Sequence, residues 1–423
     1  MSGQITSNVF RASGVIAPTV AGLNWSSAVI TGSTLSAEAA NGYYINTTSN
    51  ACTVTLPSSA ETGDQIVLVD YARTWSTNNL IIDSNGNNFQ GDPDTYTVDY
   101  DTAGQSLNIV YSDATKGWLP VSDDAVANAP TPPQTQKAIF AYGDTGSVVS
   151  TKNLMNSSGV IAADVTGVGT ARQALAATTY GSDKAIFAYG RNSSNDNISM
   201  SNLVNSSGVV AADVTGVGTV RSNLGATTYG SSGQAIFAYG YNYPTRYSMS
   251  NLVSNVGVIA TDTTGVGTAR NGLAGVPYGY DKGIFAYGNS GSVTSLSNLV
   301  SNSGVIASDT TGVGTARTDC AASGYGVGLA IFAFGYSGGS VSMSNLVSNS
   351  GVIASDVTGV GTARTLSASS YGGDKGAFAY GETDDARVSI KNLVSNTGVI
   401  SADVTGVGTG KNALAAAGYS TSA

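Results

Sequence analysis

One hydrophobic phrase recurs along the last two-thirds of the chain. It reads Lys-Ala-Ile-Phe-Ala-Tyr-Gly at 137–143, and related versions follow at 184–190, 234–240, 282–288, 329–335 and 375–381. The phenylalanines of the six copies are 47, 50, 48, 47 and 46 residues apart. A period near 47 is typical of the four-stranded blades of β-propellers and is too long for the coils of a β-helix.

Each repeat divides into four strand-like runs separated by turn residues, as the second repeat illustrates. Run a covers 172–180, run b covers 184–189, run c covers 197–204 and run d covers 209–214. Run b is apolar on both faces, which is expected of a strand that lies between two neighbouring sheets. The pattern therefore predicts six four-stranded units.

The repeat starts and stops out of phase. The first copy begins at run b, and the chain ends in an unused run a at 411–419. If this last run pairs with the first copy, the exposed edges of an open array disappear. We therefore expect residues 137–423 to form a six-bladed β-propeller closed by its C-terminal strand.

A different pattern occupies residues 36–123, where short runs alternate polar and apolar positions. These runs predict strands at 43–46, 52–56, 65–69, 80–83, 96–100 and 107–111. Asn85-Gly86 predicts a hairpin turn. We expect a β-sandwich or jelly-roll-like module here, which makes the whole chain all-β.

Two segments lack periodic apolar positions. Residues 1–35 are too short for a core and predict an anchoring arm. Residues 124–136 contain Pro130, Pro132 and Pro133 and predict a semi-rigid linker. The expected order is therefore an arm, a module for attachment and oligomerisation (36–123), a linker, and a propeller.

The composition narrows the chemistry. The 423 residues include no histidine, and the two cysteines, Cys52 and Cys320, lie far apart, so nothing indicates His-based catalysis, a zinc site or a disulfide framework. The net charge of −9 falls within residues 1–136, which hold three basic and twelve acidic residues. We expect no nucleic-acid binding and no membrane insertion, because neither a basic cluster nor a long apolar segment is present. No signal peptide is visible.

The repeat resembles kelch-type propellers. An Arg opens run a, an apolar run b ends in Gly, a variable loop follows, and two outer runs complete the unit. The copies differ from the kelch pattern in carrying one Gly after run b and no Trp in run d. The resemblance covers residues 137–423 and implies a propeller.

The N-terminal module contains a series of short strings in a fixed order. They are Gly42-Tyr-Tyr-Ile-Asn-Thr-Thr, Thr53-Val-Thr-Leu-Pro, Gly63-Asp with Val69-Asp-Tyr, Asn79-Leu-Ile-Ile, Phe89-Gln-Gly and Asp113-Ala-Thr-Lys-Gly-Trp. In this order they resemble a module of fibre and appendage proteins of tailed bacteriophages, especially marine ones. The resemblance implies a virion structural protein, often a trimer, whose residues 1–123 contact other virion proteins.

The b–c loops differ most between the copies. In an antiparallel unit they emerge on the same rim as the d–a loops, and variation on one rim of a constant scaffold is a common way to build a recognition surface. Tyr can stack on sugar rings and Arg can donate hydrogen bonds, so we expect a host-surface glycan or another polar receptor there. Unconstrained drift of the loops is the alternative. The candidate ligand-binding residues are Arg191, Tyr241, Tyr243, Arg246 and Tyr247.

Every copy also repeats an acid before, and a base after, a Thr-Gly-Val-Gly loop. One acid per loop is too few for a calcium site, so we interpret these residues as structural, in Asx-turns and in Asp–Arg pairs between blades. The acids are Asp164, Asp213, Asp262, Asp309, Asp356 and Asp403, and the bases are Arg172, Arg221, Arg270, Arg317, Arg364 and Lys411.

The acids of the variable loops give little support to an enzyme. Asp384 and Asp385 are the only unusual acid pair there, and adjacent loop acids usually point apart, so we expect no catalysis, no metal and no cofactor. The favoured function is a tail or capsid appendage of a virion that presents the propeller for host recognition. A secreted bacterial propeller lectin or adhesin and an intracellular kelch-like scaffold remain as alternatives.

Overall fold

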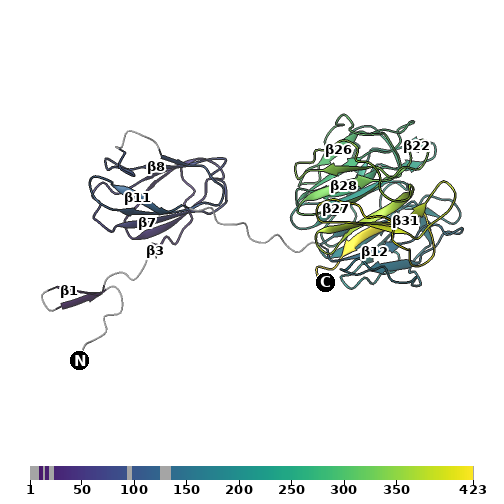
Figure 1. Ribbon diagram of the computed structural model, residues 1–423, viewed down its shortest axis with the longest axis horizontal. Coiled ribbons are helices and arrows are strands. Elements are labelled where there is room, and N and C mark those ends of the chain that lie inside the picture. Colours follow the sequence, from purple (N-terminus) through teal and green to yellow (C-terminus); the bar gives the residue numbers. More distant parts are fainter. Residues whose placement is uncertain (1–8, 13–14, 19–22, 93–97, 124–134, 423) are drawn as a thin grey trace, which may run out of the picture. The chain divides into compact units, whose positions relative to one another are not determined.

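The structure, a computed structural model, describes residues 9–12, 15–18, 23–92, 98–123 and 135–422. Every regular element in these ranges is a β-strand, which confirms the all-β class. The chain divides into two compact units, Met1–Thr131 and Pro132–Ala423 (Figure 1). The division falls in the predicted linker, of which residues 124–134 lie outside the described residues.

The N-terminal unit contains two sheets. One has the strand order β11-β10-β7-β5-β3 and the other the order β4-β6-β8-β9, and a separate hairpin joins β1 to β2. The hairpin comprises β1 (Val9–Ala12) and β2 (Val15–Pro18). The five-stranded sheet comprises β3 (Asn24–Trp25), β5 (Asn41–Ile45), β7 (Gln65–Asp70), β10 (Ser106–Tyr111) and β11 (Trp118–Ser122). The four-stranded sheet comprises β4 (Thr34–Ser36), β6 (Cys52–Thr55), β8 (Leu80–Asp83) and β9 (Val98–Tyr100).

Both sheets of this unit contribute to one hydrophobic core. Ile45 in β5, Val54 in β6 and Leu68 in β7 are completely buried in it, together with Trp75 and Trp118. Successive residues of a strand point to opposite faces, so alternate apolar positions place one face of each sheet in this core.

The strand directions differ from those of a jelly roll, which is built from antiparallel strands. From β3 to β8 the chain alternates between the two sheets, and the pairs β3–β5, β5–β7, β4–β6 and β6–β8 are parallel. The jelly-roll part of the prediction is therefore wrong. Polar and apolar alternation buries one face of a strand in either direction, so the pattern could not distinguish the two pairings.

The predicted boundary at residue 36 is also wrong, because residues assigned to the arm form strands. β3 lies at the edge of one sheet and β4 at the edge of the other. The Trp25 ring stacks on Tyr44 with a centroid distance of 4.9 Å. It also covers Gly42, where an added Cβ would lie 2.6 Å from the ring. Of the predicted arm, residues 1–8, 13–14 and 19–22 lie outside the described residues.

The Asn85-Gly86 prediction is correct for the turn but not for the hairpin. Both residues have positive φ values, 54° and 86°, as a type I′ turn requires. The strands β8 and β9 pair through Ile82 and Val98, however, so a much longer connection joins them. Within it Phe89 bridges to Trp118 on another part of the chain.

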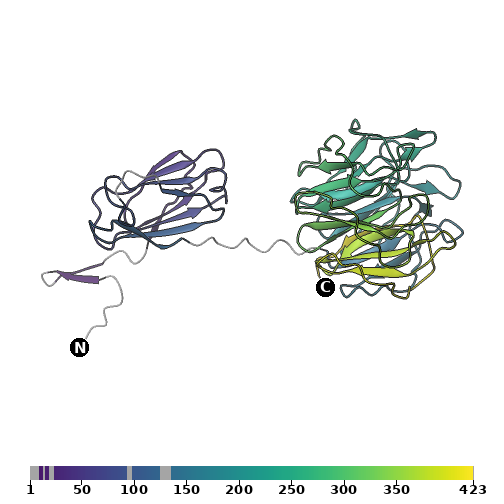
Figure 2. The same ribbon diagram turned by 45° about the horizontal axis from the view of Figure 1, so that its top comes forward.

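The C-terminal unit contains six antiparallel three-stranded sheets, which we number 1 to 6 along the chain (Figure 2). Sheet 1 comprises β33 (Ala415–Tyr419), β12 (Lys137–Ala141) and β13 (Lys152–Met155), and sheet 2 comprises β15 (Ala176–Tyr180), β16 (Lys184–Ala188) and β18 (Ser201–Val204). Sheet 3 comprises β19 (Gly225–Tyr229), β20 (Gln234–Ala238) and β23 (Ser250–Val253), and sheet 4 comprises β24 (Ala274–Tyr278), β25 (Lys282–Ala286) and β26 (Ser297–Val300). Sheet 5 comprises β27 (Ala321–Tyr325), β28 (Leu329–Ala333) and β29 (Ser344–Val347), and sheet 6 comprises β30 (Thr365–Tyr371), β31 (Lys375–Glu382) and β32 (Lys391–Val394).

The expected fourth strand of each repeat is not formed. Run d meets run c only at isolated bridges, which in sheet 1 are Met155↔Ile161 and Lys152↔Val165. Between the bridges Ala162 N donates to Leu154 O, but Ala162 O accepts from the side chain of Asn153 through Nδ2, so the backbone ladder is incomplete. The equivalent asparagines make the same bond in the other five repeats.

The six sheets follow one another in cyclic order. The innermost strands contact in the sequence β33, β15, β19, β24, β27, β30 and again β33. Backbone hydrogen bonds between the a–b turns run the same way. They are Gly181 N to Gly233 O, Gly230 N to Asp281 O, Gly279 N to Gly328 O, Gly326 N to Asp374 O, Gly372 N to Gln136 O and Ser420 N to Asp183 O.

The C-terminal strand belongs to the first sheet. β33 pairs with β12 from Lys137↔Tyr419 to Ala141↔Ala415, which confirms that the last run pairs with the first repeat. In Figure 1 the yellow C-terminal strand accordingly lies beside blue β12. Lys411 itself lies ahead of the strand.

Candidate functional site

The base that opens each repeat is completely buried between two sheets. The Arg221 guanidinium lies 4.3 Å from the centre of the Tyr189 ring of the preceding sheet and donates to Thr219 O and Asn251 Oδ1. A cation held against an aromatic face in this way joins the two sheets. The six junctions pair Arg172 with Tyr142, Arg221 with Tyr189, Arg270 with Tyr239, Arg317 with Tyr287, Arg364 with Phe334 and Lys411 with Tyr380.

The repeated acid holds the d–a loop of its own repeat. Asp262 accepts hydrogen bonds from Thr219 N at 3.0 Å, Thr219 Oγ1 at 2.6 Å and Asn251 Nδ2 at 2.9 Å. Burial alone would raise the pKa of Asp262, but these hydrogen bonds lower it below its usual value. The corresponding threonine pairs are Asp164 with Thr409, Asp213 with Thr170, Asp309 with Thr268, Asp356 with Thr315 and Asp403 with Thr362.

Two expectations about these acids need correction. Asp262 forms its ion pair with Arg221 of the same repeat, at 3.9 Å, so the Asp–Arg pairs do not join neighbouring sheets. The hydrogen bonds of Asp262 link residues eleven or more positions apart, which differs from the short-range bonds of an Asx-turn. The repeated base instead contacts the neighbouring sheet by stacking on its aromatic ring, which the sequence pattern did not reveal.

Each variable b–c loop lies beside the start of run a, next to the residue that follows the buried base. Tyr241 bridges to Ser222, Asn289 to Asn271 and Tyr336 to Thr318. These bridges place the b–c loops and the ends of the d–a loops on one rim, as the strand directions predict. We call this the variable rim.

Three of the five predicted ligand-binding residues form one cluster on the variable rim. Strands β21 (Tyr241–Asn242) and β22 (Thr245–Arg246) pair within the loop of sheet 3. The Tyr241 and Tyr243 rings meet edge to face at 6.3 Å, and the Arg246 guanidinium lies 5.5 Å from the centre of the Tyr241 ring. Tyr243 is 83% exposed, whereas Arg246 donates to Asn271 and Asn289 of the next repeat.

The other two predicted residues lie apart from this cluster. Arg191 belongs to the short strand β17 (Arg191–Asn192) of the preceding loop, which pairs with β14 (Arg172–Gln173). It is half-buried, and its Nε has no hydrogen-bond partner among the described residues. Tyr247 is also half-buried and lies near the guanidinium of Arg221.

One of the two adjacent acids in the b–c loop of sheet 6 contacts the b–c loop of sheet 5. Asp384 accepts hydrogen bonds from the backbone N and the Oγ of Ser340 in the loop of sheet 5, at 3.1 and 2.7 Å. Asp385 is exposed. The two carboxylates therefore have different surroundings, and Asp384 is already engaged.

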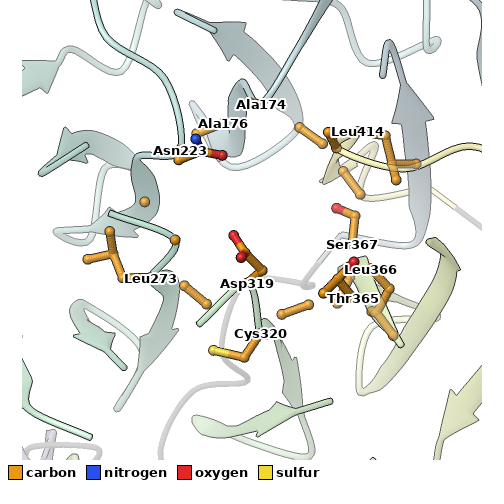
Figure 3. Close-up of a pocket in the computed structure, with 18 of the residues that line it drawn as sticks. Ala174, Ala176, Asn223, Leu273, Asp319, Cys320, Thr365, Leu366, Ser367 and Leu414 are labelled. Atoms are coloured by element: carbon orange, nitrogen blue, oxygen red, sulfur yellow. The ribbon is translucent and has the colours of Figure 1, made fainter. Parts of the chain in front are cut away.

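A cavity opens at the centre of the variable rim (Figure 3). It has a volume of about 410 Å³, and all six sheets contribute to its wall. The wall is mostly Ala, Gly and Leu, and its polar side chains come from several repeats, with three of them in sheet 6. They are Asn223, Asp319, Tyr336, Thr365, Ser367, Glu382 and Asn412.

Five repeats place one residue at the mouth of this cavity, two positions after the buried base. They are Ala174, Asn223, Gly272, Asp319 and Ala413. The sixth repeat is one residue shorter between its base and the tyrosine that ends run a, so its Leu366 takes the place of Cys320 and no residue occupies the mouth position. Backbone hydrogen bonds link the five in a chain, from Ala174 N to Ala413 O, Asn223 N to Ala174 O, Gly272 N to Asn223 O and Asp319 N to Gly272 O. These five also share the left-handed backbone region, with φ between 47° and 64°.

Asp319 is the carboxylate at this mouth. Figure 3 shows its oxygens directed into the opening, as are the polar ends of Asn223 and Ser367. Thr318 Oγ1 donates to Asp319 Oδ2 at 3.3 Å, and no ion pair of the described residues includes Asp319. Water reaches the side chain, but the surrounding protein raises the pKa of its carboxyl to about 6.

This position was not predicted from the sequence, because the repeats contain little signal for it. Aligned on the buried base, it is Ala, Asn, Gly, Asp and Ala in five repeats, but the position before it also changes, among Gln, Ser, Asn and Thr. Variation alone therefore does not distinguish the mouth position from the rest of run a.

The described residues contain no group of three or more Cys, Asp or Glu side chains placed to hold a metal ion. Within the same ranges no helix could cross a membrane. Comparison with protein families and with curated proteins gives no match for this chain.

Proposed function

We propose that the C-terminal unit is a six-bladed β-propeller and that the protein is a non-enzymatic structural protein of a virion. In this proposal the propeller belongs to a tail or capsid appendage, and its variable rim recognises the host surface. The cyclic contacts of the six innermost strands and the pairing of β33 with β12 support the propeller.

The observation that carries the recognition role is the concentration of chemical variety on one rim. Three features recur in the repeats almost unchanged: the buried base, the hydrogen bonds between the repeated Asp and Thr, and the hydrogen bond from the Asn side chain of run c to run d. The b–c loops and the mouth position, in contrast, differ from copy to copy. Tyr243 is largely exposed on this rim beside Tyr241 and Arg246. Such a group can stack on a sugar ring and donate hydrogen bonds to it.

The attachment role rests on the N-terminal unit. The strings that resemble phage appendage proteins fall largely on its strands β5, β6, β7 and β8. We propose that residues 1–123 bind other virion proteins and associate with further copies of the chain, as a trimer. The stacked pair Trp25 and Tyr44 remains partly exposed at the edge of this unit and is available for such a contact.

The rim is tested by replacing Tyr241, Tyr243 and Tyr247 together with Ala. We expect the variant protein to lose signal on a glycan array, and particles that carry it to adsorb less to host cells. Tyr280→Ala is the matched control, because Tyr280 is 54% exposed in an a–b turn on the opposite rim. Equal binding by the triple variant and the control would refute recognition by this loop.

The virion assignment needs a separate experiment. Antibodies against the propeller should label intact particles in electron micrographs. Labelling of bacterial cell surfaces in cultures that contain no particles would instead support the secreted adhesin.

A further inference from the structure

The mouth of the central cavity is chemically asymmetric. Asn223 and Asp319 flank Gly272 on one side, whereas Ala413 and Ala174 occupy the equivalent positions on the other and the sixth repeat has no residue there. An added Cβ at Gly272 would lie 2.1 Å from Thr318 Oγ1 and 2.8 Å from Asp319 Oδ1. The glycine therefore leaves room for the Asp319 carboxylate at this wall.

Asp319 lacks the partner that a carboxylate in such a place normally has. Two other acids of this rim are engaged: Asp144 pairs with Arg387 at 3.3 Å, and Glu382 accepts a hydrogen bond from Asn412. Asp319 has one hydrogen bond, from a neighbouring hydroxyl. A carboxylate that lines a cavity without a counter-ion is open to pairing with a bound cation, and that attraction is stronger inside a protein cavity than in bulk water.

The polar groups around Asp319 indicate what accompanies the cation. Asn223 and Ser367 come from sheets 3 and 6 and point into the same opening (Figure 3). A purely aliphatic amine would leave these groups without partners after it displaced water. The volume of about 410 Å³ lies near the lower end for small-molecule sites, so the ligand is small.

We propose that this mouth binds an amino sugar, with its ammonium group on Asp319 and its hydroxyls on Asn223 and Ser367. The inference deepens the proposed recognition role and rests on it for the source of the ligand, a glycan that ends in a sugar with a free amino group. The variable loops then contact the rest of that glycan.

The test is a calorimetric titration of the full chain with D-glucosamine at pH 7, where the ligand is largely protonated and Asp319 is ionised. We expect saturable binding, at least tenfold weaker binding of D-glucose and N-acetyl-D-glucosamine, and at least a tenfold loss in Asp319→Asn. Asp385→Asn is the matched control, since it removes the same charge from an exposed loop of the same rim. It should bind glucosamine as the unmodified protein does.

Three results would overturn the proposal. They are equal binding of charged and neutral sugars, equal binding by Asp319→Asn, and tighter binding of N-α-acetyl-lysine or putrescine than of glucosamine. Saturation by Mg²⁺ or Ca²⁺ with loss of the glucosamine signal would also overturn it, in favour of a cation site. A melting curve of each variant confirms that it is folded.

Failure here is distinguishable from failure of the proposed function. If glucosamine does not bind but the triple Tyr variant loses its glycan-array signal, the cavity is not the site and the rim still recognises glycans. If glucosamine binds through Asp319 but no surface glycan is recognised, the cavity is a site and host recognition is refuted.

Discussion

Sheet 1 differs from sheets 2 to 6 in how the chain supplies it. Each of the other five takes its three strands from one contiguous segment, whereas β33 reaches sheet 1 from the far end of the unit. The backbone pairing of β33 with β12 is as regular as that of β15 with β16. The backbone alone therefore does not distinguish the sheet at which the ring closes.

The side chains at this junction do distinguish it. Lys411 replaces the buried Arg and makes a 2.7 Å hydrogen bond to Asn153 Oδ1. Lys152 in sheet 1 donates to Gly208 O of sheet 2, and Lys391 in sheet 6 donates to Gly159 O of sheet 1. The equivalent residue in the other four repeats is Ser. Sheet 1, where the C-terminal strand closes the ring, is therefore the sheet whose contacts with both neighbouring sheets include a lysine hydrogen bond.

The largest effect is expected from removing the closing strand. Deletion of residues 411–423 leaves β12 with an unpaired inner edge, so the apparent melting temperature should fall by about 10 °C or more, or the protein should self-associate. Calorimetry and size-exclusion chromatography measure the two outcomes. Deletion of 421–423 alone is the control, and a truncated protein that melts as the full chain does would show that closure contributes little.

The next prediction compares the loss of unfolding free energy when the buried base is removed at an ordinary junction, Arg270, and at the junction formed by the C-terminal run, Lys411. Arg270→Met leaves Tyr287 O, Thr268 O and Asn298 Oδ1 without their donors and should cost about 3 kcal/mol in unfolding free energy. Lys411→Met removes one hydrogen bond to Asn153 and should cost about 1 kcal/mol. Urea unfolding measures both, and equal losses would mean that the junctions are energetically alike.

A smaller effect is expected from making the closing junction resemble the others. Lys391→Ser and Lys152→Ser each remove one hydrogen bond between sheets, so each should lower the unfolding free energy by about 1 kcal/mol. Lys184→Ser is the control, because among the described residues its ammonium pairs with the neighbouring Asp183 alone, and its side chain is 40% exposed. If all three variants lose the same amount, the border lysines have no special role.

The smallest effect concerns the identity of the closing base. Burial lowers the pKa of Lys411 to about 8, below its value in the unfolded chain, so the folded state releases this proton first. Stability from this group should therefore rise as the pH increases from about 8 toward 10. Lys411→Arg removes that rise and should stabilise the protein at pH 7 by about 0.5–1 kcal/mol, because Arg can reach more acceptors.

The measurement is the difference between the two proteins in urea unfolding at pH 7 and pH 9.5, which cancels the titration of shared groups. A gain from Lys411→Arg that grows with pH would contradict this assignment.

The strand order of the repeat region was predictable from the sequence, because the period, copy number and phase of the repeat can be read directly from the amino-acid sequence. The absence of a regular fourth strand was not predictable. The side chain of Asn153 donates to Ala162 O, but in the sequence Asn153 looks like an ordinary strand residue. The parallel strands of the N-terminal unit were hidden for a related reason. Alternation reports which face of β5 or β7 is buried, and it does not report direction.

The candidate site was only partly predictable. The loops could be assigned to one rim from strand direction, and Tyr241, Tyr243 and Arg246 do meet there. The cavity depends on where the mouth positions of the repeats converge, and that convergence is a property of the closed arrangement. Asp319 looks like an unremarkable polar residue until the ring places it at the centre.

Because sheet 1 combines strands from both ends of the C-terminal unit, it can form only after the last strand has been synthesised. β33 begins 278 positions after β12, so at about 5–20 residues per second the ribosome makes it roughly 15–55 s later. During that interval the inner edge of β12 has no partner, while the other five sheets each receive their strands in quick succession. A nascent C-terminal unit therefore carries one open β-edge through almost its whole translation, and crowded polysomes expose that edge to neighbouring copies in the same condition.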